Sequence, residues 1–145
     1  TDCYHMISGD IRQTDWFSGK ETGKRAIIVM EGVSMYLAPE ELEKLLRKLR
    51  SRCSSVYLLM DCYSTFAAMA SKHKNPINEV GVSHVYGLDN PKILARNVGY
   101  RFLREYNMAP TTLIRQLKAG ERILFSNLYA GNTARKLYRM FELEG

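Results

Sequence analysis

Three acidic residues follow short apolar runs in this sequence, and one of them is followed directly by glycine. Glu31 comes after "AIIVM", Asp61 after "VYLLM", and Asp10 after "YHMIS" and one glycine. If these runs are parallel strands, their carboxyl ends meet at one edge of a sheet, where α/β proteins bind ligands. A row of carboxylates at that edge suits a ligand that is cationic or rich in hydroxyl groups.

Gly32 follows Glu31 and has no Cβ, so a backbone segment or a ligand can approach the turn closely at this position. The spacing is equally compatible with a glutamate that caps a loop beside a glycine in a tight turn. The Asp10 carboxylate can likewise hydrogen-bond to the backbone of its own turn. An aspartate in the position of Asp61 is common where a strand passes into a turn. The ligand site and the plain turn therefore both stay open at this point.

Tyrosines recur in the loops that follow the apolar runs, at Tyr36, Tyr63 and Tyr86. Such rings either contact a substrate or pack half-buried against the protein. Tyr36 and Tyr63 are the candidates for substrate contact. If a substrate requires a general base, His84 is the candidate, and no catalytic residue is otherwise assigned.

Several other kinds of site are not indicated. The segments "GVSMY" and "GVSHV" lack the second glycine of the nucleophile elbow. Neither a dinucleotide-binding G-x-G-x-x-G nor a P-loop occurs. The three cysteines, which include Cys3, form no C-x-x-C pair, and the three histidines, which include His5 and His73, are far apart, so no metal site is predicted. The odd cysteine count is typical of reduced thiols in a cytoplasmic protein.

The elements that must position these residues alternate between strands and helices. Strands are predicted at Tyr4–Ser8, Ala26–Met30, Val56–Met60, Tyr100–Tyr106 and Leu137–Leu143. Helices are predicted at Thr65–Lys72, Pro91–Val98, Thr111–Leu117 and Glu121–Tyr129. This alternation indicates an α/β fold with a mainly parallel sheet flanked by helices. The continuous apolar run Ala26–Met30 is typical of a strand that is covered on both faces.

A further helix is predicted to begin at Pro39, because proline suits the first helical position and the acids after it complement the helix dipole. Its leucines repeat at intervals of three and four and should form one face buried against the sheet, while two basic residues face solvent. The residues concerned are Leu42, Leu45, Leu46 and Leu49 on the apolar face, and Arg47 and Lys48 on the other.

Composition and charge fit a single globular domain over residues 1–145. Hydrophobic residues make up 46% and charged residues 25% of the chain, as in ordinary globular proteins. No apolar run approaches the roughly 20 residues that span a bilayer, so no membrane partner is predicted. The net charge of +6 is scattered over short runs, which does not favour nucleic acid as a partner.

The segment "IIVMEGVSMYLAPEELEKLL" resembles the hallmark of the leucine carboxyl methyltransferase family, whose bacterial branch includes the tetracenomycin polyketide O-methyltransferases. The family pattern is an apolar strand, Glu-Gly, a short apolar stretch, Tyr-Leu, a proline and an acidic helix start. "ISGDIRQTDW" is similar to the family's preceding strand, and "GNTARKLYRMFELE" to the bacterial branch. The resemblance covers nearly the whole chain, and the Glu-Gly segment is its most specific part.

The resemblance implies a class I S-adenosylmethionine-dependent methyltransferase with a Rossmann-like fold. In the family, the residues matching Asp10 and Ile11 hold the adenine end of S-adenosylmethionine. The residue matching Glu31, in the turn with Gly32, contacts the same cofactor. The implied activity is methyl transfer to a carboxylate or hydroxyl oxygen of a small molecule or a peptide terminus. A carboxylate acceptor is already ionised, so catalysis would rest on alignment and exclusion of water.

Family members also carry an N-terminal half, with a glycine-rich loop and an acid that grips the ribose, which this sequence lacks. The chain is therefore expected to match the C-terminal portion of such a domain, in line with its first residue, Thr1, not being methionine. The strand beside Ala26–Met30 would then be missing, and the unpaired edge should favour self-association. The alternative function is a non-catalytic α/β half-domain that assembles with another chain.

Overall fold

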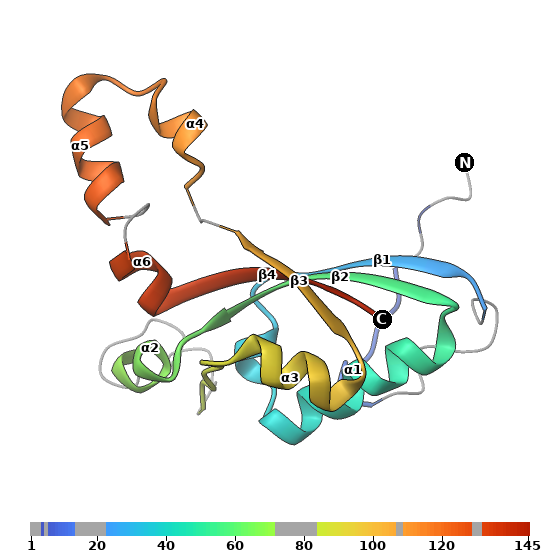
Figure 1. The fold of residues 1–145 in the computed structure, drawn as a ribbon. Helices are drawn as coiled ribbons and strands as arrows, with labels where there is room; N and C mark the ends of the chain where they lie inside the picture. The colour runs from blue at the N-terminus through green and yellow to red at the C-terminus, as the bar shows by residue number, and fades with distance from the viewer. Residues whose placement is uncertain (1–3, 5, 14–22, 72–83, 107–108, 129–131) are drawn as a thin grey trace.

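The sheet of this protein has four strands and carries helices on one face (Figure 1). The computed structural model describes residues 4, 6–13, 23–71, 84–106, 109–128 and 132–145. The strands, in chain order, are β1 (Arg25–Met30), β2 (Ser55–Tyr63), β3 (Arg101–Tyr106) and β4 (Tyr138–Glu144). Their order across the sheet is β1-β2-β4-β3, and β4 runs against both of its neighbours while β1 and β2 are parallel. The prediction of an α/β fold is confirmed.

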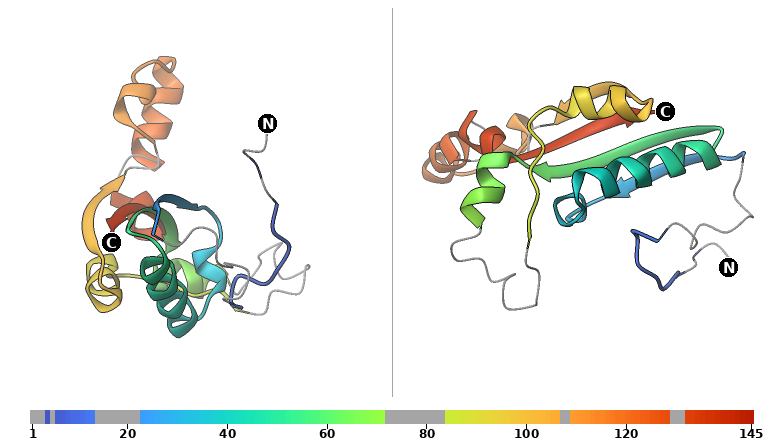
Figure 2. Two further views of the ribbon diagram at one scale, coloured as in Figure 1. Left: turned by 90° about the vertical axis from the view of Figure 1, so that its right-hand side faces the viewer. Right: turned by 90° about the horizontal axis from the view of Figure 1, so that it is seen from below.

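The helices divide into a group that packs on the sheet and a group that leaves it. The bounds are Ser34–Tyr36 for the 3₁₀ turn η2, Pro39–Arg52 for α1, Thr65–Ala70 for α2, Pro91–Val98 for α3, Thr111–Ile114 for α4, Ala119–Leu128 for α5 and Asn132–Leu137 for α6. Figures 1 and 2 show α1 and α3 side by side on one face, whereas α4 and α5 project away from the sheet. Helices α4 and α5 therefore do not lie over the face of the sheet that α1 and α3 cover.

Helix α1 forms as its sequence predicts. Its first turn is closed because the Glu41 carboxylate accepts a hydrogen bond from the Ala38 backbone N–H, at 2.8 Å, and Pro39 occupies the first position. The four leucines of the apolar face are all buried. Arg47 is exposed and Lys48 is partly exposed.

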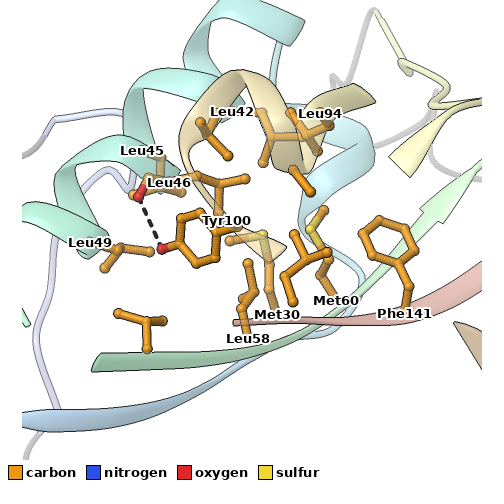
Figure 3. Packing of buried hydrophobic residues seen from close by; sticks show 14 of the residues in the cluster. Met30, Leu42, Leu45, Leu46, Leu49, Leu58, Met60, Leu94, Tyr100 and Phe141 are labelled. Atoms are coloured by element: carbon orange, nitrogen blue, oxygen red, sulfur yellow. Dashed lines mark hydrogen bonds between the residues drawn. The ribbon is translucent and has the colours of Figure 1, made fainter. Parts of the chain in front are cut away.

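The core lies between α1, α3 and the covered face of the sheet (Figure 3). Leu46, Leu58 and Phe141 come from α1, β2 and β4 and have no exposed surface. Tyr100 is buried beside them, and its hydroxyl donates to the Leu46 carbonyl at 3.1 Å. Burying a Leu or Phe side chain stabilises the fold by about 1.5–3 kcal/mol, so this cluster holds the two helices on the sheet.

Strand β1 differs from its prediction, because only one of its faces is covered by the described residues. Exposure alternates along the strand, and Ile27 and Val29 are 79% and 67% exposed. A continuous apolar run does not reveal how many layers will cover it, which is why the expectation of two covered faces was wrong. Within the described residues β1 pairs only with β2.

Other sequence predictions differ from the structure at their ends. Tyr4 and residues 6–8 form no strand and are exposed, so the strand predicted at Tyr4–Ser8 is wrong for these residues. Helix α4 stops at Ile114, three residues before its predicted end, and α5 starts earlier than predicted, at Ala119. The short helix α6 was not predicted. The sequence analysis also names residues that lie outside the described part of the chain: Thr1, Cys3, His5, Lys72, His73 and Tyr129.

Candidate functional site

Glu31 and Asp61 lie side by side where β1 ends, and their proximity agrees with the sequence prediction. In the parallel pair β1 and β2, Met30 stands opposite Met60, so the residue that follows each methionine is also adjacent. The two acids line one groove of about 460 Å³ on the open face of the sheet. Its other lining residues are mostly apolar: Val29, Met30, Leu59, Met60, Tyr106, Pro110, Met140 and Phe141.

Asp61 is an internal residue of the sheet and does not follow a strand. Strand β2 continues to Tyr63, because its last three residues pair with Tyr138–Met140 of β4. The Asp61 residue is only 2% exposed. The expectation that the strand ends at Met60 was therefore wrong, since pairing with a strand far along the chain extends it.

The Asp61 carboxylate is held by two donors from different segments. The backbone N–H of Gly32 donates to its Oδ1 and Oδ2, at 3.0 and 2.9 Å, and the hydroxyl of Tyr138 donates to Oδ2. The Asp61 backbone carbonyl accepts a hydrogen bond from a third donor, the hydroxyl of the buried Ser34. Asp61 thus ties the turn after β1 to the start of β4.

Gly32 is required by its backbone conformation. Its φ is 66°, in the left-handed region where a side chain is unfavourable, and nothing lies within 4 Å of the position that a Cβ would take. Within the described residues, close packing is therefore not the reason for glycine here. The turn directs Glu31 outwards, and the Glu31 side chain is exposed.

Asp10 lies in a turn of its own, and the described residues before it form no strand. Its carboxylate accepts hydrogen bonds from the Arg12 backbone N–H, Nε and Nη2, at 3.0, 2.9 and 2.6 Å. The Arg12 guanidinium and backbone N–H lower the pKa of Asp10 to about 2. Ile11 packs against the core and lines a second groove, between β1 and α1. Glu31 and Ile11 thus line different grooves.

The tyrosines expected to contact a substrate lie close to this edge. Tyr36 ends η2, and the pKa of its hydroxyl is raised by partial burial and by the neighbouring Tyr63. Tyr63 ends β2 and makes an edge-to-face contact with Tyr138, with the ring centroids 5.6 Å apart. Tyr86 stacks on His84 at 6.4 Å.

Tyr138 is the residue of this site that sequence reasoning missed. It falls in the predicted strand Leu137–Leu143, where nothing distinguishes it from other strand tyrosines. Burial raises the pKa of its hydroxyl, and the hydrogen bond to Asp61 and the charge of Glu31 add to this. The hydroxyl therefore stays protonated at neutral pH and acts as a donor to Asp61.

The described residues contain neither a metal-binding cluster nor a membrane-spanning helix. No group of three or more His, Cys, Asp or Glu residues lies there in a position to hold a metal ion. Cys53 and Cys62 are reduced cysteines, and burial raises the pKa of Cys62 to about 12, which makes that thiol unreactive. None of the described helices has the length and apolar character that a membrane span needs.

The chain is similar to known methyltransferases. It is 23% identical over 122 residues to the tetracenomycin polyketide synthesis O-methyltransferase TcmP of Streptomyces glaucescens, over 83% of this chain and 45% of the relative. Among solved structures it resembles the magnesium protoporphyrin IX methyltransferase ChlM of Synechocystis PCC 6803, with a TM-score of 0.50 and 15% identity over 94% of this chain and 48% of the other. A methyltransferase of Leishmania major gives a TM-score of 0.49 at 12% identity, over 93% of this chain and 43% of its own. No protein-family model matches the chain.

These similarities agree with the sheet and its helices. The chain spans about half the length of the relatives it matches. At 15% identity the similarity to the ChlM structure establishes the fold alone. The chain therefore has the α/β fold of the class I S-adenosylmethionine-dependent methyltransferases.

Proposed function

We propose that the protein transfers a methyl group from S-adenosylmethionine to an oxygen atom of a small molecule or a peptide terminus. The fold and the distant relationship to TcmP support methyl transfer. The resemblance of the Glu31–Gly32 segment to the leucine carboxyl methyltransferase family supports oxygen as the acceptor atom. Under this proposal residues 1–145 correspond to the C-terminal portion of the methyltransferase domain.

The observation that carries the proposal is the position of Glu31. Its side chain is exposed at the carboxyl end of β1, and among the described residues no hydrogen bond or ion pair uses its carboxylate. A carboxylate in this position can accept hydrogen bonds from the ammonium or hydroxyl groups of S-adenosylmethionine. Gly32, in the same turn, leaves open space beside it.

Asp10 and Ile11 are proposed to hold the adenine end of the cofactor, as the resemblance implies. Ile11 is partly buried against the core and offers an apolar contact. Both Asp10 oxygens already accept hydrogen bonds from Arg12. A ligand N–H would therefore share or replace one of these bonds, which makes Glu31 the stronger candidate of the two acids.

The chemistry that these residues must assist is simple. When bound, S-adenosylmethionine supplies an electrophilic methyl group. A carboxylate acceptor would arrive ionised, so the protein need only align it and exclude water. Tyr36 and Tyr63 are proposed to contact the acceptor, because they lie near enough to each other for Tyr63 to raise the pKa of Tyr36. No residue is assigned as a general base.

Replacing Glu31 by glutamine should weaken the binding of S-adenosylmethionine about 10- to 100-fold, because a hydrogen bond to a charged group contributes about 1.5–3 kcal/mol. Isothermal titration of the full-length protein measures the change. Glu40→Gln is the matched control: it removes one negative charge from an exposed residue of α1 and should leave the affinity unchanged. Equal affinities in both variants would contradict the role of Glu31.

The exposed surface of β1 favours a second candidate, a half-domain that assembles with another chain. The edge of β1 that pairs with no described strand adjoins the exposed side chains of Ile27 and Val29, and Tyr57 and Leu59 of β2 continue the apolar surface. A free edge with apolar neighbours favours strand pairing. We propose a second copy of the chain as the partner, paired along β1.

A polypeptide of residues 1–145 should accordingly self-associate at micromolar concentration. Replacing Ile27 and Val29 by lysine should return it to a monomer, because charged side chains block edge pairing. Analytical ultracentrifugation measures both states. Leu113→Lys, an exposed position on α4, is the control and should remain associated. A monomeric parent polypeptide would refute this candidate.

A further inference from the structure

We propose that Asp61 and Tyr138 are positioning residues that fix the Glu31–Gly32 turn, so that the Glu31 carboxylate is presented to the ligand. The identity of that ligand as S-adenosylmethionine rests on the proposed function. The positioning role rests on contacts within the protein. It reassigns Asp61, which the sequence groups with Asp10 and Glu31 as an acid at the ligand edge.

The surroundings of Asp61 fit an internal anchor better than a ligand contact. The residue is almost fully buried, and both carboxylate oxygens are occupied by donors from the protein. Glu31, one residue before the anchored N–H, is exposed. The two neighbouring acids therefore have different tasks, one facing inwards and one facing the solvent.

The turn needs such an anchor because it contains a glycine with left-handed backbone. Gly32 has access to more backbone conformations than any other residue, and its own φ of 66° is one of several that it could adopt. The bond from its N–H to Asp61 fixes the peptide group that joins it to Glu31. Ser34 adds a second attachment two residues later, on the backbone carbonyl of Asp61.

Tyr138 completes the anchor from β4. Its hydroxyl donates to the same Oδ2 that Gly32 contacts, and its ring packs edge-to-face on Tyr63. The ring contact restricts the Tyr138 side chain, and the hydrogen bond restricts the rotation of the Asp61 carboxylate. Loss of the hydroxyl should thus loosen the turn while the ring packing stays.

Hydrogen exchange at the Gly32 amide tests the anchor without any ligand. In the full-length protein, Tyr138→Phe should raise the exchange rate of this amide about 3- to 10-fold, and Asp61→Asn should raise it at least as much, because a neutral acceptor binds the N–H less strongly. Tyr57→Phe is the control: it removes the hydroxyl of a β2 tyrosine that hydrogen-bonds a different carboxylate, that of Glu144, and should leave the exchange rate of Gly32 unchanged. An unchanged Gly32 rate in Tyr138→Phe would overturn the proposal.

A double-mutant cycle then tests whether the anchor acts through Glu31. Titration with S-adenosylmethionine should show that Tyr138→Phe weakens binding about 3- to 10-fold in the parent protein but less than about 2-fold in the Glu31→Gln background. Equal losses in both backgrounds would contradict positioning through Glu31. If the parent protein binds no S-adenosylmethionine, the proposed function fails, and the exchange measurement still decides the role of Asp61 and Tyr138.

Discussion

Replacing Leu46 by alanine is expected to lower the free energy of unfolding by about 2–5 kcal/mol. Leu46 has no exposed surface and lies at the centre of the core cluster, between α1 and the sheet (Figure 3). Its backbone carbonyl also accepts the Tyr100 hydroxyl, which restrains α1 and limits how far the surroundings can collapse into the cavity. Urea denaturation followed by circular dichroism measures the loss.

The matched control for this change is Leu113→Ala on α4. Leu113 is 58% exposed, so the same truncation should change the free energy of unfolding by no more than about 0.5 kcal/mol. A loss at Leu46 that is as small as the loss at Leu113 would mean that α1 is peripheral to the stability of the fold.

Gly87→Ala is expected to destabilise the protein by about 1–3 kcal/mol or more. A Cβ at this position would lie 2.4 Å from the backbone N and Cα of Thr65 and 2.5 Å from the carbonyl carbon of Ser64. Both neighbours are backbone at the start of α2, so they cannot move aside as a flexible side chain could. The segment around Gly87 also pairs with the end of β2, where the Leu88 N–H donates to the Tyr63 carbonyl at 2.8 Å.

Gly120→Ala tests whether this effect comes from the close contact. Gly120 lies in α5 with nothing within 4 Å of its Cβ position, and alanine favours a helix over glycine by up to about 1 kcal/mol. Thermal unfolding should therefore show a lower melting temperature for Gly87→Ala and an equal or higher one for Gly120→Ala. Similar losses in both variants would show that backbone contact at Gly87 is not the cause.

Local sequence signals predicted the elements that local interactions determine. Helix α1 follows from its proline, its early acids and the spacing of its leucines, and α3 is found at the predicted Pro91–Val98. The N-terminus of α3 is capped because Asn90 Oδ1 accepts a hydrogen bond from the Ile93 N–H, at 3.2 Å. Each of these interactions joins residues within one turn, so the sequence pattern contains all the information needed.

Features that depend on distant residues could not be predicted in this way. Asp61 and Tyr138 are 77 positions apart, and only the pairing of β2 with β4 brings them together. The same pairing extends β2 beyond Met60. The open face of β1 was missed for a related reason, because the run Ala26–Met30 reads the same whether one layer or two layers cover it. Glu31 and Asp61 were correctly predicted to be neighbours, because the apolar runs before them pair in parallel with Met30 opposite Met60.

The place of β4 between β2 and β3 has a consequence for how the chain folds during synthesis. Strands β2 and β3 are synthesised before β4. Until β4 inserts between them, the backbone N–H and C=O groups on their facing edges have no strand partner. The ribosome must therefore release the residues of β4 before β3 can join β1 and β2 in one sheet, and pairing over such sequence distances is slow. In that interval β2 and β3 offer free edges to other nascent chains, which makes this stage of folding the one most exposed to aggregation.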